Sequence, residues 1–521
     1  MDIIICNNRS YYDKYVKYVK YVKYVKYVKY VINIIIKYYI MIKIKNGLSY
    51  NKNGWKYISI YGNARDRGKA YGELCVDEFI KIQEMLKFLI YETYGIQWVD
   101  LIVDISKDFK EITKEKYPEF YEEMEGIAEG CCKTNVCKTT VDEIIAWNFY
   151  CSISYWINKS KSEFHVGKEG GSGSKDRCSA FIAVGKDWTE DGQIVCAHNS
   201  FCDYIDGQYS NIILDLHPEE RDGKKGCRII MQTSACMIWS GTDFFITSNG
   251  IIGTETTIGG FIAYAKKIPI GYRIRDAMQY GRSLDNYCEI LLEGNSGDYA
   301  NSWLFGDINT NEILRIELGL KFHNIERTKN GYFIGFNAPY DERIRNIEVQ
   351  NSGMYDIRRH QGARQVRLSD LMDLHKGKLN ITIAQQILAD HYDVYLLKDN
   401  NPCSRTVCSH YELDAREYMC QANRPKPYAP HGAVDGMVCD SNLAKKMSFI
   451  GRYGNSCGIP FITSDFAKKH RQWNVFTPYI HDRPSQPWTL FSITLLNKSK
   501  SKSKSKKMIS NNKTKKILNK K

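Results

Sequence analysis

The segment KDRCSAFIAV, residues 175–184, joins two parts of the chain that follow different patterns. Residues 170–177 are rich in Gly, Ser and charged side chains, which is typical of an exposed linker. Residues 179–184 form a short apolar run that predicts a buried β-strand. Cys178 therefore lies where a flexible linker meets the first strand of a sheet.

Two interpretations of Cys178 follow from this position. In the simpler one it is a cysteine at the edge of a strand. In the other, the peptide bond between Arg177 and Cys178 is cut, so that Cys178 becomes a chain terminus with a thiol and a free α-amine. An α-amine titrates near pH 8 and can accept the thiol proton, so a nucleophile and its base would share one residue.

The patterns on the two sides of this junction predict an α+β fold. Upstream, residues 69–94 and 105–129 have amphipathic helical spacing broken at Pro118, and Thr140 with Glu143 forms a capping box. Downstream, β-type runs alternate with turn signals, and residues 270–292 and 368–392 contain helical patterns. We expect antiparallel hairpins with turns at residues 189–192, 249–250, 307–311 and 330–331.

Four motifs in order carry a family resemblance. They are Cys178-Ser-Ala-Phe-Ile, Ala197-His-Asn-Ser-Phe, Ser240-Gly-Thr-Asp-Phe-Phe with Thr254-Glu-Thr-Thr, and Asn301-Ser-Trp. Together they resemble the phospholipase B-like proteins, which are related to the cysteine-type acyltransferases and acid-amide hydrolases among the N-terminal-nucleophile hydrolases. The resemblance implies a four-layer αββα fold and autocatalytic cleavage between Arg177 and Cys178.

The resemblance also assigns roles to other residues. His198 is placed beside the nucleophile, where a cationic or hydrogen-bonding imidazole would hold the thiolate or a substrate oxygen. Thr254 and Asn301 match positions that supply oxyanion contacts. All three also have a purely structural interpretation.

Three further residues have a weaker link to the site. Asn199 and Arg345 are candidate substrate or charge contacts, with Arg345 as the cation that such sites often contain, although a surface Arg explains it equally well. Phe201 stands where the family often has Trp, which affects the shape of the pocket rather than its chemistry.

The net charge of +14 comes from the ends of the chain. Residues 1–45 contain nine Lys, one Arg and two Asp, and residues 498–521 contain eleven Lys and no acid, so residues 46–497 carry −5. An acidic body argues against nucleic-acid binding, although the basic tails are candidates for peripheral membrane contact. We therefore divide the chain into a Lys-Tyr-Val tail (1–45), a helical prosegment or light chain (46–177), a nucleophile-bearing part (178–497) and a Lys/Ser tail (498–521).

The seventeen cysteines show no CxxC pair. Cys403, Cys408 and His410 are soft ligands close in sequence, but their spacing is irregular and no fourth ligand is evident, so we expect no metal and no cofactor. The sequence shows no clear signal peptide or membrane span, and only the family resemblance suggests a secreted or lysosome-like setting.

Together these observations predict a hydrolase that cleaves an acyl ester or amide bond in a lipid or a small N-acyl compound. After cleavage, the two pieces of the chain are expected to stay associated. Two alternatives stay open. One is acyl transfer to a small amine, and the other is a lipid-binding protein that has the fold without turnover.

Overall fold

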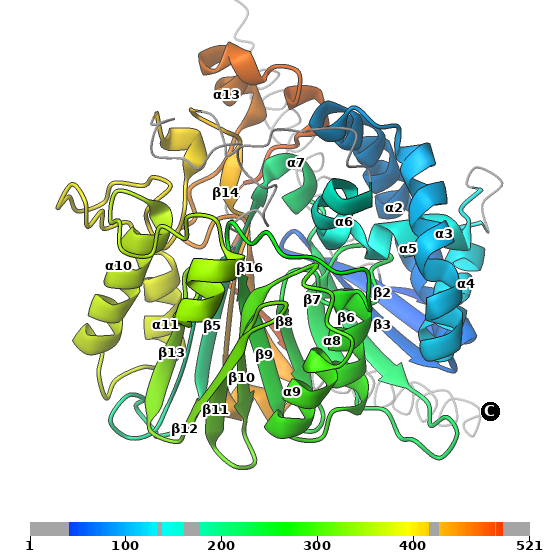
Figure 1. Ribbon diagram of the computed structural model, residues 1–521, viewed down its shortest axis with the longest axis horizontal. Coiled ribbons are helices and arrows are strands. Elements are labelled where there is room, and N and C mark those ends of the chain that lie inside the picture. Colours follow the sequence, from blue (N-terminus) through cyan, green and yellow to red (C-terminus); the bar gives the residue numbers. More distant parts are fainter. Residues whose placement is uncertain (1–40, 133–137, 161–177, 416–426, 485, 493–521) are drawn as a thin grey trace, which may run out of the picture.

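The computed structural model describes residues 41–132, 138–160, 178–415, 427–484 and 486–492. The predicted linker at 170–177, including Arg177, and the predicted tail at 498–521 lie outside these residues. The fold is α+β, as predicted, with two large sheets and helices packed against them. Figure 1 shows α10 (His360–Leu374) and α11 (Ile381–Leu388) on one side of the sheets, and the helices α2 to α5 on the other.

The larger sheet has ten strands, all antiparallel to their neighbours except for the parallel pair β3 and β6. In spatial order they are β1 (Ile42–Ile44), β2 (Gly47–Lys52), β3 (Trp55–Gly62), β6 (Ile212–Pro218), β7 (Ile229–Thr233), β8 (Phe244–Thr247), β9 (Ile251–Thr257), β10 (Asn301–Asp307), β11 (Glu312–Leu318) and β12 (His323–Thr328).

The smaller sheet has seven strands and carries Cys178. Its order is β13 (Gly331–Gly335), β4 (Cys178–Val184), β5 (Val195–Asp203), β15 (Asp435–Asp440), β16 (Ser448–Tyr453) and β17 (Thr489–Ser492), and β14 (His431–Ala433) also pairs with β5.

The remaining helices pack mostly beside the larger sheet. Those beside it are α2 (Ala64–Tyr94), α3 (Trp98–Lys116), α4 (Pro118–Cys131), α5 (Val141–Asn148), α6 (Ile153–Ser160), α8 (Ile270–Tyr280) and α9 (Leu284–Leu292). Three short helices lie elsewhere: α7 (Tyr204–Gly207), α12 (Ser441–Ala444) and α13 (Thr463–Lys469). The predicted capping box at Thr140 and Glu143 is present, and the predicted break at Pro118 lies where α3 ends and α4 begins. Each of these signals acts within one helical turn, which is why the sequence alone predicts them well.

Strand β4 shows how the apolar residues divide between two cores. Ala180 and Ile182 point toward the larger sheet and join the core between the two sheets. Phe181 and Ala183 point the other way and join the core under α10 and α11. This alternation follows from the two-residue period of a strand. Because both faces of β4 are covered, its first residue is also held in a buried position.

Three predictions about organisation need correction. Residues 330–331 do not close a hairpin, because β12 pairs with β11 in the larger sheet and β13 pairs with β4 in the smaller one. Ile42–Ile44, placed in the tail, form an edge strand through the turn at Asn46, whose φ is +61°. The segment before Cys178 is mainly helical but also supplies β2 and β3 to the larger sheet.

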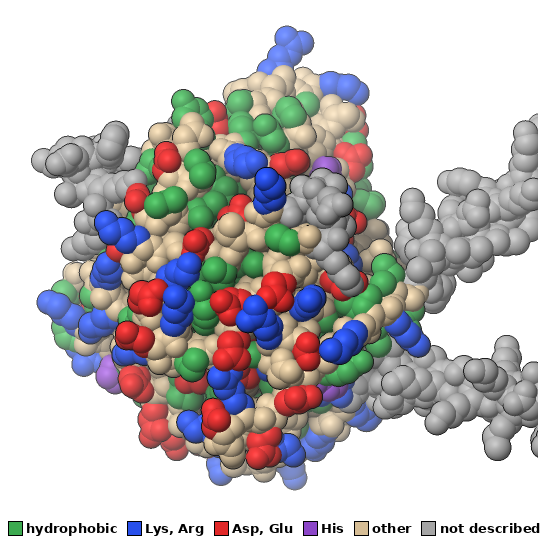
Figure 2. All heavy atoms as spheres, turned by 90° about the vertical axis from the view of Figure 1, so that its right-hand side faces the viewer, with side chains coloured by type: hydrophobic (Ala, Val, Ile, Leu, Met, Phe, Trp, Pro, Cys, Tyr) green, Lys and Arg blue, Asp and Glu red, His purple; other side chains and the backbone are tan. Residues whose placement is uncertain are grey.

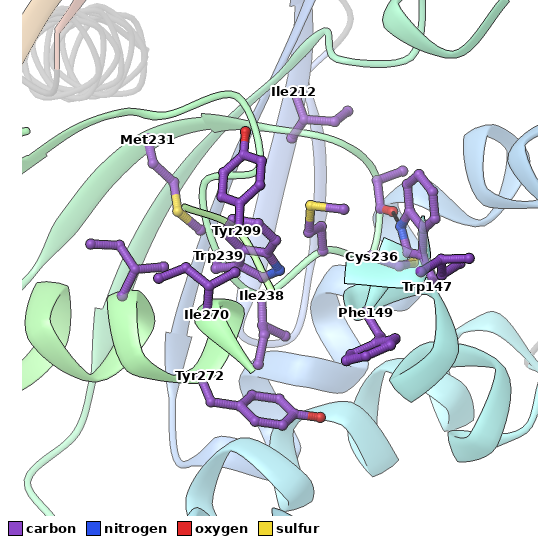
Figure 3. Packing of buried hydrophobic residues seen from close by; sticks show 14 of the residues in the cluster. Trp147, Phe149, Ile212, Met231, Cys236, Ile238, Trp239, Ile270, Tyr272 and Tyr299 are labelled. Carbon is purple, nitrogen blue, oxygen red and sulfur yellow. Dashed lines mark hydrogen bonds between the residues drawn. The ribbon is translucent and has the colours of Figure 1, made fainter. Parts of the chain in front are cut away.

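A buried apolar contact joins the segment before Cys178 to the rest of the chain (Figure 3). Trp147 on α5 donates its indole N–H to the carbonyl oxygen of Ala235 at 2.8 Å. The indole of Trp239 donates in return to the carbonyl oxygen of Asn148 at 3.1 Å. All the labelled side chains in this view belong to the core between the helices and the larger sheet. The upstream helices are therefore part of the main core.

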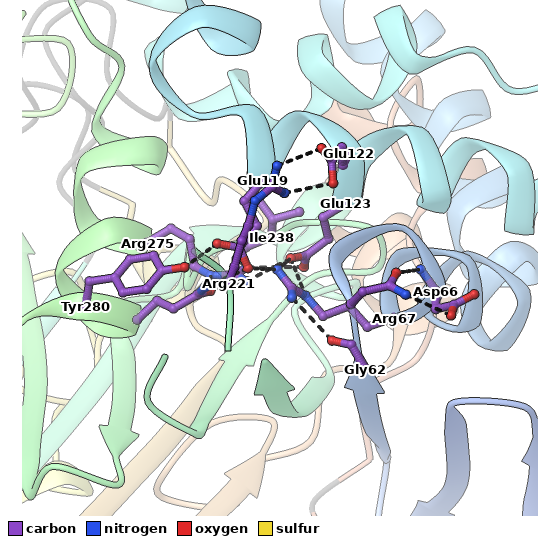
Figure 4. A network of polar contacts seen from close by, with 12 residues as sticks. Gly62, Asp66, Arg67, Glu119, Glu122, Glu123, Arg221, Ile238, Arg275 and Tyr280 are labelled. Carbon is purple, nitrogen blue, oxygen red and sulfur yellow. Dashed lines mark hydrogen bonds and ion pairs between the residues drawn. The ribbon is translucent and has the colours of Figure 1, made fainter. Parts of the chain in front are cut away.

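A buried ion network makes a second connection (Figure 4). Glu123 on α4 forms ion pairs with Arg67 of α2 at 2.6 Å and with Arg275 of α8 at 2.8 Å, and all three side chains are at most 1% exposed. Glu119 extends the network by pairing with Arg67 at 2.7 Å and by hydrogen bonding to Tyr280. The network thus links two upstream helices to one downstream helix.

The face formed by the upstream helices carries charges of both signs (Figure 2). Several of them are paired, as in Arg65 with Glu125 and Lys110 with Asp142. A groove of about 530 Å³ between α3 and α5 opens here and is lined by residues such as Val99, Val103 and Lys110. Among the described residues, no helix is both long enough and apolar enough to cross a membrane.

Candidate active site

Cys178 is the first residue of β4 and lies directly opposite Ser200 of β5. Its side chain is buried, at 2% exposure. Its backbone nitrogen donates to Oδ1 of Asn337 at 3.3 Å. The residue that the sequence singles out is thus held in the interior at the end of the smaller sheet, where it faces the strands β8 and β9.

Two carboxylates lie against the thiol. The Sγ atom of Cys178 and a carboxylate oxygen from each of Asp243 and Glu255 are all within 4.8 Å of one another. Asp243 precedes β8 with a φ of +61°, and Glu255 belongs to β9. The hydroxyl of Tyr299 lies 3.0 Å from an oxygen of each carboxylate. Three such groups could also contact a metal ion, although they lack the fourth protein ligand of a closed site.

This environment opposes ionisation of the thiol. Burial is the main cause that raises the pKa of Cys178, and the charges of Glu255 and Asp243 add to it. Burial and the neighbouring Asp243 likewise raise the pKa of Glu255. In the uncut chain the thiol is therefore neutral at physiological pH, and a thiolate at this position needs an additional base or cation.

An arginine and an asparagine fix the backbone of Cys178. Arg364 of α10 donates to the carbonyl oxygen of Cys178, to Oγ of Ser179 at 3.2 Å and to Oδ1 of Asn337 at 2.8 Å. Its guanidinium lies over the ring of Phe201, 5.1 Å from the centroid. Asn337 adopts a φ of +67° and donates its Nδ2 to the carbonyl oxygen of Thr257 at 2.7 Å. Both backbone polar groups of Cys178 thus have side-chain partners.

His198 lies on β5 opposite Ala180, two residues along the strand from the partner of Cys178. Burial lowers the pKa of His198 to about 3, and a backbone contact with Glu255 offsets only part of this shift. The imidazole is therefore neutral at physiological pH. Burial thus disfavours a cationic His198 in the uncut chain, and the role expected for His198 beside the nucleophile stays a prediction.

Thr254 and Asn301 lie on neighbouring strands, and each has unused hydrogen-bonding capacity. Oγ1 of Thr254 and both amide atoms of Asn301 are buried and have no hydrogen-bond partner among the described residues. Asn301 is opposite Thr257, so strand alternation places it on the face of the sheet that carries Glu255, whereas Thr254 points to the other face. The two predicted oxyanion residues are thus not on the same face.

Two predicted contacts have structural partners instead. Asn199 donates to the carbonyl oxygens of Leu388 at 2.8 Å and Val407 at 3.2 Å, because it points away from the larger sheet. Arg345 donates to the carbonyl oxygens of Pro339 at 3.1 Å and Tyr340 at 2.8 Å, and so holds a turn. Arg364 supplies a cation next to the backbone of Cys178, where it donates to the carbonyl oxygen.

Four residues of the site are not predicted from the sequence: Asp243, Glu255, Asn337 and Arg364. Asp243 and Glu255 stand inside the motifs quoted for the family resemblance, and an acidic residue in an otherwise Thr-rich strand was a usable signal. Arg364 offered none, because it follows Cys178 by 186 positions and reaches it only through packing of α10.

Comparisons with known proteins agree with the resemblance. Residues 92–316 match the model of the family described as Phospholipase B. Phospholipase B-like protein B of Dictyostelium discoideum is 22% identical over 333 residues, which cover 59% of this chain and 54% of that protein. Phospholipase B of Crotalus adamanteus is 24% identical over 295 residues, which cover 52% of this chain and 50% of that protein. The chain thus spans about half the length of the curated relatives it matches.

Proposed function

Because this chain is a relative of the phospholipase B-like proteins, we propose that it hydrolyses an acyl ester or amide bond of a lipid and uses Cys178 as the nucleophile after cleavage of the Arg177–Cys178 bond. The observation that carries the proposal is the setting of Cys178. It is the first residue of a buried strand, with two carboxylates near its thiol and side-chain partners on its backbone nitrogen and oxygen.

Cleavage supplies the base that the uncut site lacks. The new α-amine of Cys178 would stay beside Oδ1 of Asn337, which accepts a hydrogen bond from the same nitrogen at 3.3 Å in the uncut chain. Neutral amine accepts the thiol proton, and the resulting ammonium is stabilised by the nearby Glu255 and Asp243. The two carboxylates thus oppose a lone thiolate but favour the pair of thiolate and ammonium.

The reaction then proceeds by acyl transfer to sulfur. The thiolate attacks the acyl carbon, the bond from carbon to the leaving oxygen or nitrogen breaks, and the leaving group takes the proton from the ammonium. Water attacks the thioester next, the amine accepts its proton, and the free acid leaves as the thiol re-forms. We assign the oxyanion to the side-chain amide of Asn301, with backbone N–H groups assisting. This amide is buried on the face of the sheet that carries Glu255, and it has no hydrogen-bond partner within the part of the chain that the structure describes.

The two pieces would remain one folded unit after cleavage. Strand β3 from the upstream piece pairs along its length with β6 from the downstream piece, from Lys56 opposite Ile212 to Gly62 opposite Pro218. The network around Glu123 and the contacts of Trp147 also cross between the pieces. We further propose that the two sheets and their outer helices form the αββα arrangement of N-terminal-nucleophile hydrolases, supported by apolar cores on both faces of β4.

Turnover on matched substrates tests the proposal. Wild-type protein and the Cys178→Ser and Cys178→Ala variants are assayed on lysophospholipids, diacyl phospholipids and N-acyl amines of equal chain length. We expect product from the wild type, strongly reduced product from Cys178→Ser and none from Cys178→Ala, with unchanged circular dichroism. Full activity of Cys178→Ala would overturn the assignment of the nucleophile. Binding of lipid without turnover by the cleaved wild type would favour the lipid-binding alternative.

A further inference from the structure

A second cluster of reactive side chains lies away from Cys178, around His410. His391 follows α11, Cys408 and His410 precede the short helix Tyr411–Leu413, and Cys457 follows β16. One ligand atom from each of these four residues lies within 4.8 Å of the others. Three segments distant in sequence therefore bring two thiols and two imidazoles to one point.

The spacing fits the edges of a coordination tetrahedron. Nε2 of His410 is 3.5 Å from Sγ of Cys408 and 3.4 Å from Sγ of Cys457. Bonds of about 2.3 Å from zinc to sulfur and about 2.0–2.1 Å to nitrogen give a sulfur-to-nitrogen edge of about 3.6 Å in a regular tetrahedron. The two distances are thus close to those that a central ion requires.

The second ring nitrogen of His410 has the partner that a metal-bound histidine usually has. Nδ1 of His410 lies 2.8 Å from Oε1 of Glu412, and the imidazole is fully buried. A carboxylate on one ring nitrogen fixes the tautomer and directs the other nitrogen toward a metal. Glu412 therefore orients Nε2 of His410 toward both thiols.

We propose that His391, Cys408, His410 and Cys457 bind one zinc ion in a closed tetrahedral site. Two thiolates and two imidazoles are a donor set that selects zinc by softness and geometry. Four protein ligands leave no position for water or substrate, so the ion is structural rather than catalytic. Two thiolates also balance the charge of a divalent ion.

The proposed site departs from the sequence-based expectation of no metal. Cys403 is not part of it, because its Sγ lies 3.7 Å from Oδ2 of Asp393. The missing ligands are His391 and Cys457, which stand 17 residues before and 49 residues after Cys408. Such spacing matches no short zinc motif, so only the fold brings the four residues together.

The ion would support the active site through one layer of packing. Phe201 of β5 belongs to a small apolar cluster with Cys408 and Ala433, against which Cys457 packs. The ring of Phe201 also lies against the guanidinium of Arg364, which donates to the carbonyl oxygen of Cys178. The zinc site thus fixes Cys408 and Cys457, which pack against Phe201. Phe201 in turn supports the position of Arg364.

The direct test is the metal content of the full chain, purified without chelator, measured by inductively coupled plasma mass spectrometry. We expect about one zinc per chain in the wild type, and a thiolate-to-cobalt charge-transfer band with tetrahedral d–d bands after exchange to Co²⁺. Cys457→Ser and His391→Ala should lose the metal, while the matched control Cys403→Ser should keep it. Glu412→Gln should weaken zinc affinity by about 10- to 100-fold.

Several results would overturn the zinc site. One is wild-type protein without stoichiometric metal whose peptide map shows a Cys408–Cys457 disulfide. Another is zinc content that Cys457→Ser leaves unchanged in folded protein. If the variants do not fold, the Co²⁺ spectrum of the wild type still decides, because octahedral bands or no bands refute the proposed ligands. Metal content is measured without turnover, so the test is independent of the proposed hydrolysis.

Discussion

The ion network between the two pieces gives a quantitative prediction about Glu123. Glu123→Gln keeps the shape of the side chain but removes the charge that Arg67 and Arg275 share at 2.6 and 2.8 Å. Removing one partner of a buried pair costs about 3–5 kcal/mol, here because Arg275 stays buried without its carboxylate partner, whereas Arg67 keeps Glu119 at 2.7 Å. A loss of about 4 kcal/mol lowers the ratio of folded to unfolded protein about a thousandfold.

A neighbouring glutamate on the same helix, Glu122, supplies the control for the effect of burial. Glu122 of α4 pairs with Arg221 at 2.8 Å, also across the two pieces, but the side chains are 41% and 33% exposed. Glu122→Gln should therefore cost at most about 1 kcal/mol. Both variants are compared by urea unfolding, followed by tryptophan fluorescence, in a Cys178→Ala background that remains one chain. Equal losses for Glu122→Gln and Glu123→Gln would refute the role of burial in this network.

Three further predictions concern residues near Cys178. Arg364→Gln should slow turnover at least about tenfold, because it releases the carbonyl oxygen of Cys178. The control variant Arg345→Gln should leave kcat unchanged. Equal kcat values for the two variants in an activity assay would contradict this role of Arg364. Burial raises the pKa of Asp435 to about 6, so its carboxyl contributes stability below about pH 4 that is lost as the pH rises through 6. The unfolding free energy of the wild type, relative to that of Asp435→Asn, should thus fall by about 2 kcal/mol between pH 4 and 7. A difference between the two proteins that does not change with pH in urea titrations would refute it. His198→Gln should leave the pH profile of kcat between 5 and 8 unshifted, because a neutral imidazole with a pKa of about 3 does not titrate there, and a displaced limb would show otherwise.

The sequence predicts features that depend on neighbours in the chain. The helix start at Thr140, the break at Pro118 and the strand after Cys178 all depend on signals within a few residues. The turn at Asn330 shows the limit of such signals. A turn signal predicts a change of direction, but whether the flanking strands pair depends on the partners that the sheets offer.

The residues of the candidate site also differ in whether local sequence predicts them. Cys178 is recognisable because its linker and its strand adjoin it in the sequence. The cation was assigned to Arg345 on residue type and nearby motif, whereas Arg364 contacts Cys178 only because α10 packs over β4 and β5. The four residues of the proposed zinc site also converge only in the fold. Long-range convergence leaves no local pattern in the sequence.

In the proposed mechanism, Cys178 becomes a chain terminus and acts as the nucleophile from that position. Intact mass measurement and N-terminal sequencing of the purified wild type test it most directly. The account predicts a piece that begins at Cys178 and stays bound to the upstream piece in gel filtration, and a single uncut chain for Cys178→Ala. A wild-type protein that hydrolyses acyl lipids while the bond between Arg177 and Cys178 is intact would contradict it.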